Sequence, residues 1–334
     1  MTTKMVKKVF ALFLVALMVC SLCACGNSES TTDDADDDDK PYVPGPAIDK
    51  VVSANYTSEF PYISLVNLNS FMSTEFTSVE YVASTGNAYR SPYWDYETEP
   101  ILLGHNAVAI TEDYVLYADG TVRSVESDED WGVTGVIEIE QGDVNNHTRL
   151  IALRNDGTMF VQDEHDEHSD FYKAEEWTDI IAISASIVHL VGLKSDGTAV
   201  AAGGNHCGQC DVEHWTDIIA IGTANHNGYS ATYGVKKDGT VVTTEEGYDV
   251  SAWTDIVAIA ATDNFVMGLK DDGTVVTSGD DYKGETKISH WTDIVAIQAY
   301  RGLSIGIKAD GTVVSAGDDY VVSKYLKDVK IKVD

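Results

Sequence analysis

Residues 253–290 read WTDIVAIAATDNFVMGLKDDGTVVTSGDDYKGETKISH, and this 38-residue stretch decides the fold because it is one copy of a repeat. Its opening tetrapeptide, Trp-Thr-Asp-Ile, occurs four times, each copy 38 residues after the previous one, at Trp177, Trp215, Trp253 and Trp291. Self-similarity at a fixed period of this length is the signature of a stacked or radial repeat architecture.

Each repeat is expected to contain three or four short antiparallel strands. The runs 256–259, 265–270 and 274–278 are apolar or β-branched and lie between polar residues, which is typical of strands. A tight turn separates the last two, because glycine adopts the positive φ of hairpin turns and aspartate bonds its own backbone. This Asp-Gly-Thr turn recurs at Asp119, Asp156, Asp196, Asp238, Asp272 and Asp310.

Three weaker units precede the four clear ones. Residues 136–139 lie before Asp156, residues 101–103 lie before Asp119, and we take both runs as leading strands. Residues 79–91 align with 266–278 without a gap, and 62–68 would lead that first unit. The chain therefore contains seven repeat units, and the clear repeats cover residues 98–324. An insertion after Ile218 is expected in a loop on one face.

The fold predicted for residues 47–334 is all-β, a single seven-bladed β-propeller with blades of three to four antiparallel strands. Such small sheets cannot bury both faces alone, and radial stacking covers them while leaving few open edges. A linear solenoid would need polar caps at its ends, which the sequence does not show. A glycine in each second strand (Gly192, Gly234, Gly268, Gly306) fits crowding where blades taper toward an axial channel. For closure we favour residues 329–333 over 50–56, because Asp328-Val329 stands where the next Trp-Thr-Asp-Ile would fall.

The repeat resembles a known family. The unit 177–215, WTDIIAISASIVHLVGLKSDGTAVAAGGNHCGQCDVEHW, is similar to the bacterial form of the regulator-of-chromosome-condensation repeat. Its short period is closer to the secreted β-lactamase-inhibitor propeller of that superfamily. The resemblance implies a seven-bladed propeller and little about function, because this fold hosts exchange factors, inhibitors and many other proteins. The family's frequent histidine at the start of the second strand falls only on His189.

Residues 1–24 read as an export signal of a bacterial lipoprotein. Three lysines precede an apolar core over 9–22, too short for a spanning helix. Leu22-Cys23-Ala24-Cys25-Gly26 looks like a lipobox, so by resemblance Cys25 carries the lipid; the alternative is a plain secretory peptide. We therefore expect an extracytoplasmic protein, lipid-anchored to a bacterial cell membrane and facing outward.

Residues 25–46 are expected to form a disordered tether, because a Ser/Thr/Asp-rich segment cannot bury apolar surface. Calcium collection by its aspartates is the lesser alternative. The formal net charge of the whole chain is −32, and without the signal it becomes −35. Such a surface repels phosphate backbones, so we expect no nucleic-acid partner and favour a cationic one. We also expect a monomer.

Few residues suggest chemistry. Cys207 and Cys210 form a C-x-x-C pair that could stay as free thiols, close a small loop disulfide outside the cytoplasm, or, least favoured, act in redox or zinc chemistry. His165 and His168 sit among carboxylates in a loop, where a solvated segment is favoured over a metal site. We expect no cofactor, no metal and no catalytic residue.

The recurring acids and tryptophans are interpreted as structural. The Asp of Asp-Gly-Thr is explained by the turn, and the Asp of Trp-Thr-Asp-Ile (Asp179 and its equivalents) by the start of the leading strand. The four tryptophans could form a sugar-stacking platform, but their fixed place before the leading strand favours packing between blades.

Two function classes remain. The first is a non-enzymatic module that binds a protein or glycan through the loops of one face, with contacts at His189, His226, Tyr229, Phe265, Tyr300 and Arg301, because aromatics and arginine dominate binding hot spots. The second is a lyase or hydrolase with carboxylates and His189 gathered over the axial channel. Inhibition of a secreted enzyme rests on analogy alone.

Overall fold

In the computed structural model the chain divides into two units, residues 1–49 and 50–334, and all described residues lie in the second. They are 66–69, 78–83, 85–90, 100–111, 113–125, 131–144, 147–162, 170–226, 229–244, 247–300, 302–319, 322–323 and 326. The export signal, Cys25, the acidic tether, residues 163–168 and both closure candidates fall outside them. Among the described residues, no helix has the length and apolarity needed to cross a membrane.

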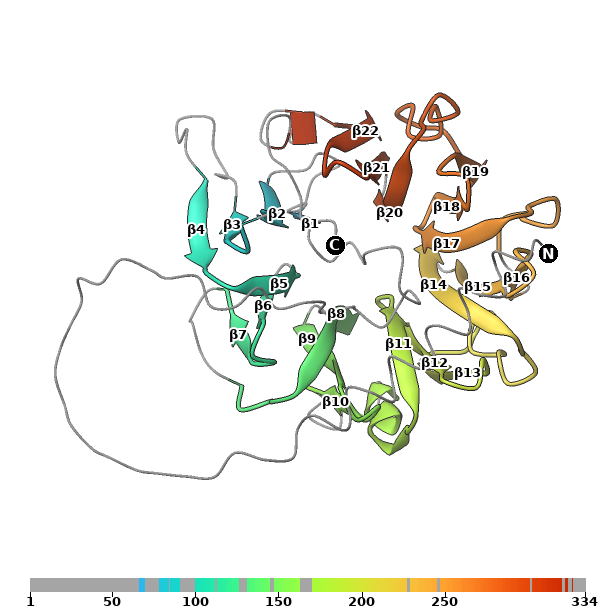
Figure 1. Ribbon diagram of the computed structural model, residues 1–334. Coiled ribbons are helices and arrows are strands. Elements are labelled where there is room, and N and C mark those ends of the chain that lie inside the picture. The colour runs from blue at the N-terminus through green and yellow to red at the C-terminus, as the bar shows by residue number, and fades with distance from the viewer. Residues whose placement is uncertain are drawn as a thin grey trace, which may run out of the picture. The chain divides into compact units, whose positions relative to one another are not determined.

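The unit 50–334 is the seven-bladed β-propeller that the repeat predicts. Seven antiparallel sheets, here called blades 1 to 7, follow one another along the chain. Figure 1 shows them around a common centre, with the first strand of each blade innermost. Blade 1 has four strands and each of the others has three. One short 3-10 helix, η1 (Phe171–Glu176), joins blades 3 and 4.

The strand bounds follow the repeat. Blades 1 to 3 contain β1 (Val66–Asn69), β2 (Ser78–Val82), β3 (Ala88–Arg90) and β4 (Ile101–Gly104); β5 (Ala107–Ile110), β6 (Tyr114–Tyr117) and β7 (Val122–Ser124); β8 (Val136–Val144), β9 (His147–Arg154) and β10 (Met159–Val161). Blades 4 and 5 contain β11 (Ile180–Ala185), β12 (His189–Lys194) and β13 (Ala199–Gly203); β14 (Ile218–His226), β15 (Tyr229–Lys236) and β16 (Val241–Thr243). Blades 6 and 7 contain β17 (Ile256–Ala261), β18 (Phe265–Lys270) and β19 (Val275–Gly279); β20 (Ile294–Tyr300), β21 (Leu303–Lys308) and β22 (Val313–Gly317).

Two expectations about strands are corrected. Residues 101–103 do not lead blade 2, because β4 pairs with β3 as the outer strand of blade 1, and β5 leads blade 2 instead. The insertion after Ile218 does not form a separate loop. It prolongs the hairpin of β14 and β15, whose pairing continues to His226 opposite Tyr229.

Each tryptophan packs between two blades, as predicted. Trp215 is buried with Val191 and Leu193 of blade 4 as well as Ile218 of blade 5, and Trp291 is buried in the same way between blades 6 and 7. Each ring also covers the second-strand glycine of its own blade: a Cβ on Gly268 would lie 2.8 Å from the Trp253 ring. The glycine is therefore required by the tryptophan, and the predicted crowding of strands near the channel is not the reason for it.

We expect Gly268→Ala to lower the free energy of unfolding by about 1–3 kcal/mol, the typical cost of overpacking. In a Trp253→Leu background the same change should cost little, because the ring that the new methyl meets is gone. Chemical denaturation of the four proteins of this double-mutant cycle measures the coupling. Gly204→Ala is the control, because its Cβ would lie no closer than 3.4 Å to any atom. Equal costs in both backgrounds would refute the steric explanation.

Consecutive blades are joined by one repeated backbone link. The first residue of each leading strand donates its N–H to the glycine carbonyl of the preceding Asp-Gly turn, or of its counterpart in blade 1. The pairs are Ala107 to Gly86 (2.8 Å), Val136 to Gly120 (3.1 Å), Ile180 to Gly157 (3.2 Å), Ile218 to Gly197 (2.9 Å), Ile256 to Gly239 (3.0 Å) and Ile294 to Gly273 (3.1 Å). The residue before each strand is left-handed, with φ of 58–64° at Asn106, Asp179, Asp217, Asp255 and Asp293. Aspartate and asparagine tolerate this conformation best among non-glycine residues, which explains the Asp of Trp-Thr-Asp-Ile.

The first and last blades are in contact, which closes the ring. One buried cluster contains Tyr81, Val82 and Ala88 of blade 1 together with Leu303 and Ile305 of blade 7. Apolar burial of this kind stabilises by about 1.5–3 kcal/mol for each fully buried large side chain. An open solenoid would have no such cluster between its ends.

Candidate functional site

The propeller has two unlike ends. At one end, here called the turn face, lie the Asp-Gly turns and the starts of the leading strands. At the other end, here called the loop face, the first and second strands of each blade are joined, by residues 186–188 in blade 4 and 262–264 in blade 6. The third strands also end there, because Gly279 pairs with Phe265.

The polar groups of the turn face serve the fold. In blade 4, Asp196 Oδ1 accepts the backbone N–H of Thr198 (2.9 Å) and its hydroxyl (2.6 Å). The Asp-Gly-Thr turns of blades 2, 3, 5 and 6 repeat both bonds, and that of blade 7 repeats the backbone bond. The threonine hydroxyl, more than any other contact, lowers the pKa of Asp196. These aspartates are turn residues, as the sequence predicted.

Two of the predicted contact residues are inaccessible. His189 and Phe265 both begin second strands on the loop face, and both are 0% exposed. Their side chains turn into the packing between blades because alternate residues of a strand point to opposite faces. The expectation that they contact a ligand is therefore wrong.

Of the other predicted contacts, the structure describes the side chain of Tyr300 alone. Tyr300 ends β20, is partly buried and packs against the cluster between blades 1 and 7. His226 and Tyr229 are the last pair of the long β14–β15 hairpin, and their side chains are outside the described part. Arg301 is also outside it.

His189 links blades 4 and 5 through a chain of hydrogen bonds. The Thr232 hydroxyl donates to the carbonyl of Gln209 (2.7 Å), so it accepts from His189 Nε2–H (3.0 Å). Nδ1 is then the acceptor for the Ser186 hydroxyl (2.8 Å). Burial lowers the pKa of His189 to about 4. The imidazole is a neutral structural group near pH 7.

The enzyme hypothesis required carboxylates around this histidine. In the described part of the chain its partners are the hydroxyls of Ser186 and Thr232. A general base works best with a pKa near the operating pH, and the pKa of His189 lies well below it. The geometry therefore favours a structural role for the Ser186–His189 pair.

Cys207 and Cys210 lie in the loop after β13, and no disulfide joins them in the structure. Cys210 Sγ lies 3.3 Å from the carbonyl oxygen of Gly204. Burial, assisted by Asp211 and Asp170, raises the pKa of the Cys210 thiol to about 11, which disfavours the reactive thiolate. In the part of the chain that is described, no group of three or more His, Cys, Asp or Glu residues could hold a metal ion.

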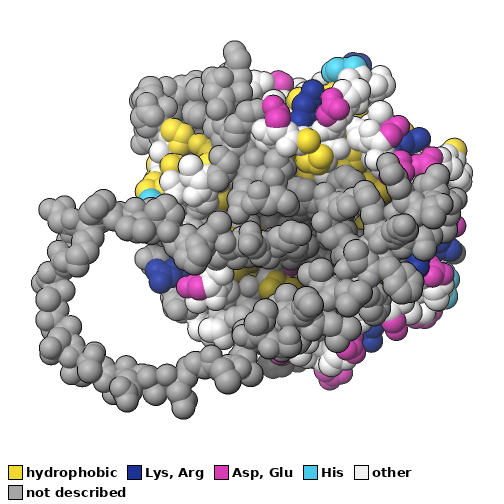
Figure 2. All heavy atoms as spheres, viewed as in Figure 1, with side chains coloured by type: hydrophobic (Ala, Val, Ile, Leu, Met, Phe, Trp, Pro, Cys, Tyr) yellow, Lys and Arg dark blue, Asp and Glu magenta, His cyan; other side chains and the backbone are white. Residues whose placement is uncertain are grey.

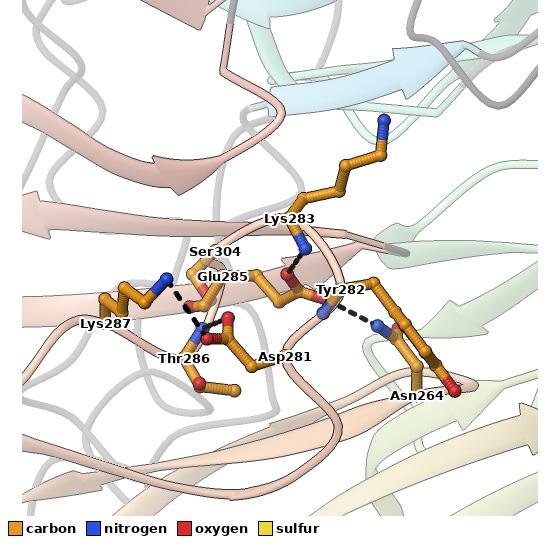
Figure 3. Close-up of polar contacts among 8 residues, drawn as sticks. All are labelled: Asn264, Asp281, Tyr282, Lys283, Glu285, Thr286, Lys287 and Ser304. Carbon is orange, nitrogen blue, oxygen red and sulfur yellow. Dashed lines mark hydrogen bonds and ion pairs between the residues drawn. The ribbon is translucent and has the colours of Figure 1, made fainter.

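A polar cluster that the sequence did not reveal lies on the loop face between blades 6 and 7 (Figure 3). Glu285 is 0% exposed, and its carboxylate accepts from Lys283 N (2.6 Å), Asn264 Nδ2 (2.6 Å) and Tyr282 N (3.2 Å). Its backbone carbonyl accepts from the Ser304 hydroxyl (2.7 Å). These bonds fix the loop that carries Tyr282, whose side chain is 68% exposed.

Glu285 is the counterpart of Gln209. Each residue is buried and precedes its tryptophan by six residues. The side-chain oxygen of each accepts from the backbone N–H of the residue two positions upstream. The backbone carbonyl of each accepts from a hydroxyl of the next blade. This spacing is the signal from which the cluster could have been found.

We expect Glu285→Gln to cost about 1 kcal/mol of stability, because a neutral amide keeps one acceptor but loses the charged bonds to Tyr282 and Asn264. Glu285→Ala should cost more, because three N–H groups lose their acceptor. Thermal unfolding of both variants measures this difference. If neither variant unfolds at a lower temperature than the wild type, the carboxylate bonds contribute nothing.

Surface charge is mixed on the described residues. Figure 2 shows Asp and Glu side chains interspersed with Lys and Arg around the rim in this view. Exposed large apolar side chains are Ile101 (48%), Leu102 (47%), Ile187 (50%) and Tyr282 (68%). The first two lie on the outer strand β4, while Ile187 and Tyr282 lie on the loop face.

Known structures share this fold. No protein-family model and no curated protein matches the chain. The complex of Kap60 with yeast RCC1 (Prp20) matches with 12% identity over 92% of this chain and 90% of that chain, with a TM-score of 0.54. The CRINKLY WD40 ectodomain of the Arabidopsis thaliana receptor kinase ACR4 matches with 14% identity over 76% and 94%, with a TM-score of 0.53. At such identities the likeness concerns the fold alone: the chain is a β-propeller, as these two proteins are.

Proposed function

We propose that this protein is a lipid-anchored propeller on the outer side of a bacterial cell membrane that binds a protein through its loop face and catalyses no reaction. The observation that carries the proposal is the contrast between the two faces. The turn face repeats the same bonds in successive blades, whereas the loop face differs between blades in hairpin length and presents Ile187 and Tyr282 to solvent.

Two further points support a protein partner. Exposed aromatic side chains held by a rigid scaffold are typical anchors of protein interfaces. The yeast RCC1 structure is itself a complex with a protein, Kap60, and the ACR4 propeller is a receptor ectodomain.

The charge of the chain bears on the chemistry of the partner. A net charge of −32 favours a cationic partner and disfavours nucleic acid.

Proximity labelling from the full chain on living cells tests the binding face. The loop-face triple variant carries Tyr229→Ser, Tyr300→Ser and Arg301→Ser. We expect the labelling of its principal protein neighbours to fall about fivefold or more, which is the effect of removing a hot spot. The matched control is a turn-face triple variant, Lys194→Ser with Lys236→Ser and Asp271→Ser, which changes the net charge equally.

The outcomes separate the alternatives. Thermal unfolding first establishes that both triple variants remain folded. An unchanged neighbour set in the loop-face variant, or its loss in the turn-face variant, contradicts the proposed face. Labelled glycan in place of protein contradicts the proposed partner class.

The anchor is tested separately by Cys25→Ser. Without the thiol the diacylglycerol thioether cannot form, and we expect the protein to move from the membrane fraction to the soluble one. Incorporation of an alkyne-tagged fatty acid should be lost at the same time. Unchanged membrane retention or unchanged labelling of this variant contradicts lipidation at Cys25.

A further inference from the structure

A tyrosine-lined corner lies on the loop face where the loops that follow β16 and β19 meet the β17–β18 loop. Tyr248 comes from the first loop, Asp280 and Tyr282 from the second, and Asp263 and Asn264 from the third. Tyr248 Oη lies 3.5 Å from the carbonyl oxygen of Asp263, and Asp280 N donates to the carbonyl of Asn264 (2.7 Å). We call these five residues the tyrosine corner.

The Tyr282 ring is held in an exposed position. Its hydroxyl donates to Asp280 Oδ2 (2.9 Å), and its backbone N–H donates to the buried Glu285 carboxylate. The residue is nevertheless 68% exposed. An aromatic side chain fixed at both ends loses little conformational entropy when a ligand stacks on it.

The corner carries negative potential. Burial, together with the nearby Asp280, Tyr282 and Asp263, raises the pKa of Tyr248 to about 12. Two lysines of the Tyr282 loop form ion pairs with aspartates outside the corner: Lys287 with Asp281 (3.4 Å) and Lys283 with Asp318 (3.5 Å). A cation arriving at Tyr248 and Tyr282 would therefore meet favourable electrostatics.

A buried amide ties the corner to Glu285. Asn264 is 1% exposed, and its Nδ2 shares the Glu285 oxygen with the backbone N–H of Tyr282. Figure 3 shows the Asn264 amide directed at the Glu285 carboxylate. The β17–β18 loop and the loop of Tyr282 are therefore held together at the base of the corner.

We propose that the tyrosine corner binds an arginine side chain of the protein partner. The guanidinium would stack on the tyrosine rings and face the carboxylates of Asp263 and Asp280. Arginine fits better than lysine because its planar group stacks on aromatic rings and offers five N–H donors in a fixed fork. This inference rests on the proposed function and specifies the chemistry of the partner.

Fluorine NMR of the full chain labelled with 3-fluorotyrosine tests the corner directly. The probe is N-acetylarginine methylamide, and the Tyr248 and Tyr282 signals are assigned with Tyr248→Phe and Tyr282→Phe. We expect both signals to shift saturably, with weaker binding of the lysine analogue and none of the citrulline analogue, which keeps the shape without the charge. Tyr282→Leu should weaken binding about threefold, as expected for one exposed cation–π contact.

Asp280→Asn tests the charge, and Asp271→Asn is its control, because it removes the same charge from the turn face of the same blade. We expect weaker binding only in the first, and a loss of affinity with added salt. Unshifted tyrosine signals, equal binding of arginine and citrulline, or equal loss in both Asp variants overturns the proposal. If the arginine probe fails while the loop-face triple variant still loses its neighbours, the proposed function stands and the tyrosine corner does not.

Discussion

Gly239→Ala should lower the free energy of unfolding by about 2–5 kcal/mol, the sum of left-handed backbone strain and a steric clash. Gly239 has φ of +82°, and its added Cβ would lie 2.8 Å from the backbone nitrogen of Asp255. This contact is backbone to backbone, so no side-chain rotation relieves it. The clash falls on the link between blades 5 and 6, where Ile256 N donates to Gly239 O.

Gly208→Ala separates the two causes. Its φ of +75° is nearly the same, but its Cβ would meet only the end of the Asp211 side chain, at 3.1 Å. We expect a cost of about 1–2 kcal/mol from the backbone conformation alone. Equilibrium denaturation in urea measures both variants. If Gly239→Ala costs no more than Gly208→Ala, close approach of the blades does not constrain the turn.

The second large effect is a loss of stability in acid that depends on His189. Its pKa is about 4 in the folded protein against 6.5 for the free side chain. Between these values the unfolded chain binds a proton that the folded chain does not, so stability falls as the pH falls from 6.5 to about 4. The accumulated loss is about 3 kcal/mol, since each pKa unit corresponds to about 1.4 kcal/mol.

His189→Leu isolates this contribution, because Leu303 occupies the equivalent buried position of blade 7. We expect the variant to lose less stability than the wild type between pH 7 and pH 4. Protonation of the turn aspartates also destabilises the fold in acid, because the bonds that lower their pKa values stabilise the charged form. This effect is the same in the wild type and in His189→Leu. Parallel stability curves would contradict a neutral buried imidazole.

Much of this architecture could be predicted from spacing alone. A 38-residue period, a fixed Asp-Gly turn and three apolar runs determine the strands, because hydrophobic alternation and turn chemistry are local properties. The weak first unit was also found, since Gly86 aligned with Gly273, and both have φ near 80°. The misassigned strand at 101–103 has the composition of a leading strand, and only its pairing with β3 places it at an outer edge.

The candidate site was harder to predict, because contact between side chains is not periodic. His189 and Phe265 lie on the loop face as expected, but their side chains are buried in the packing between blades and do not reach solvent. Their counterparts Ala231 and Leu303 are apolar and buried, and that common character was the available sign of burial. Tyr282 lies in an irregular loop where no pattern indicates exposure. The contact of a tryptophan with its glycine joins residues that are 15 apart in blades 4, 6 and 7 and 19 apart in blade 5.

The backbone link between turn and following strand has a consequence for how the protein matures. Every such link joins a blade to the one made just before it. A chain that folds from its N-terminus as it is synthesised can therefore dock each new sheet on the sheet formed before it, with short loops to close. The cluster that joins Tyr81 and Val82 of blade 1 with Leu303 and Ile305 of blade 7 combines the two ends of the described chain, so the ring can close only after blade 7 has been made.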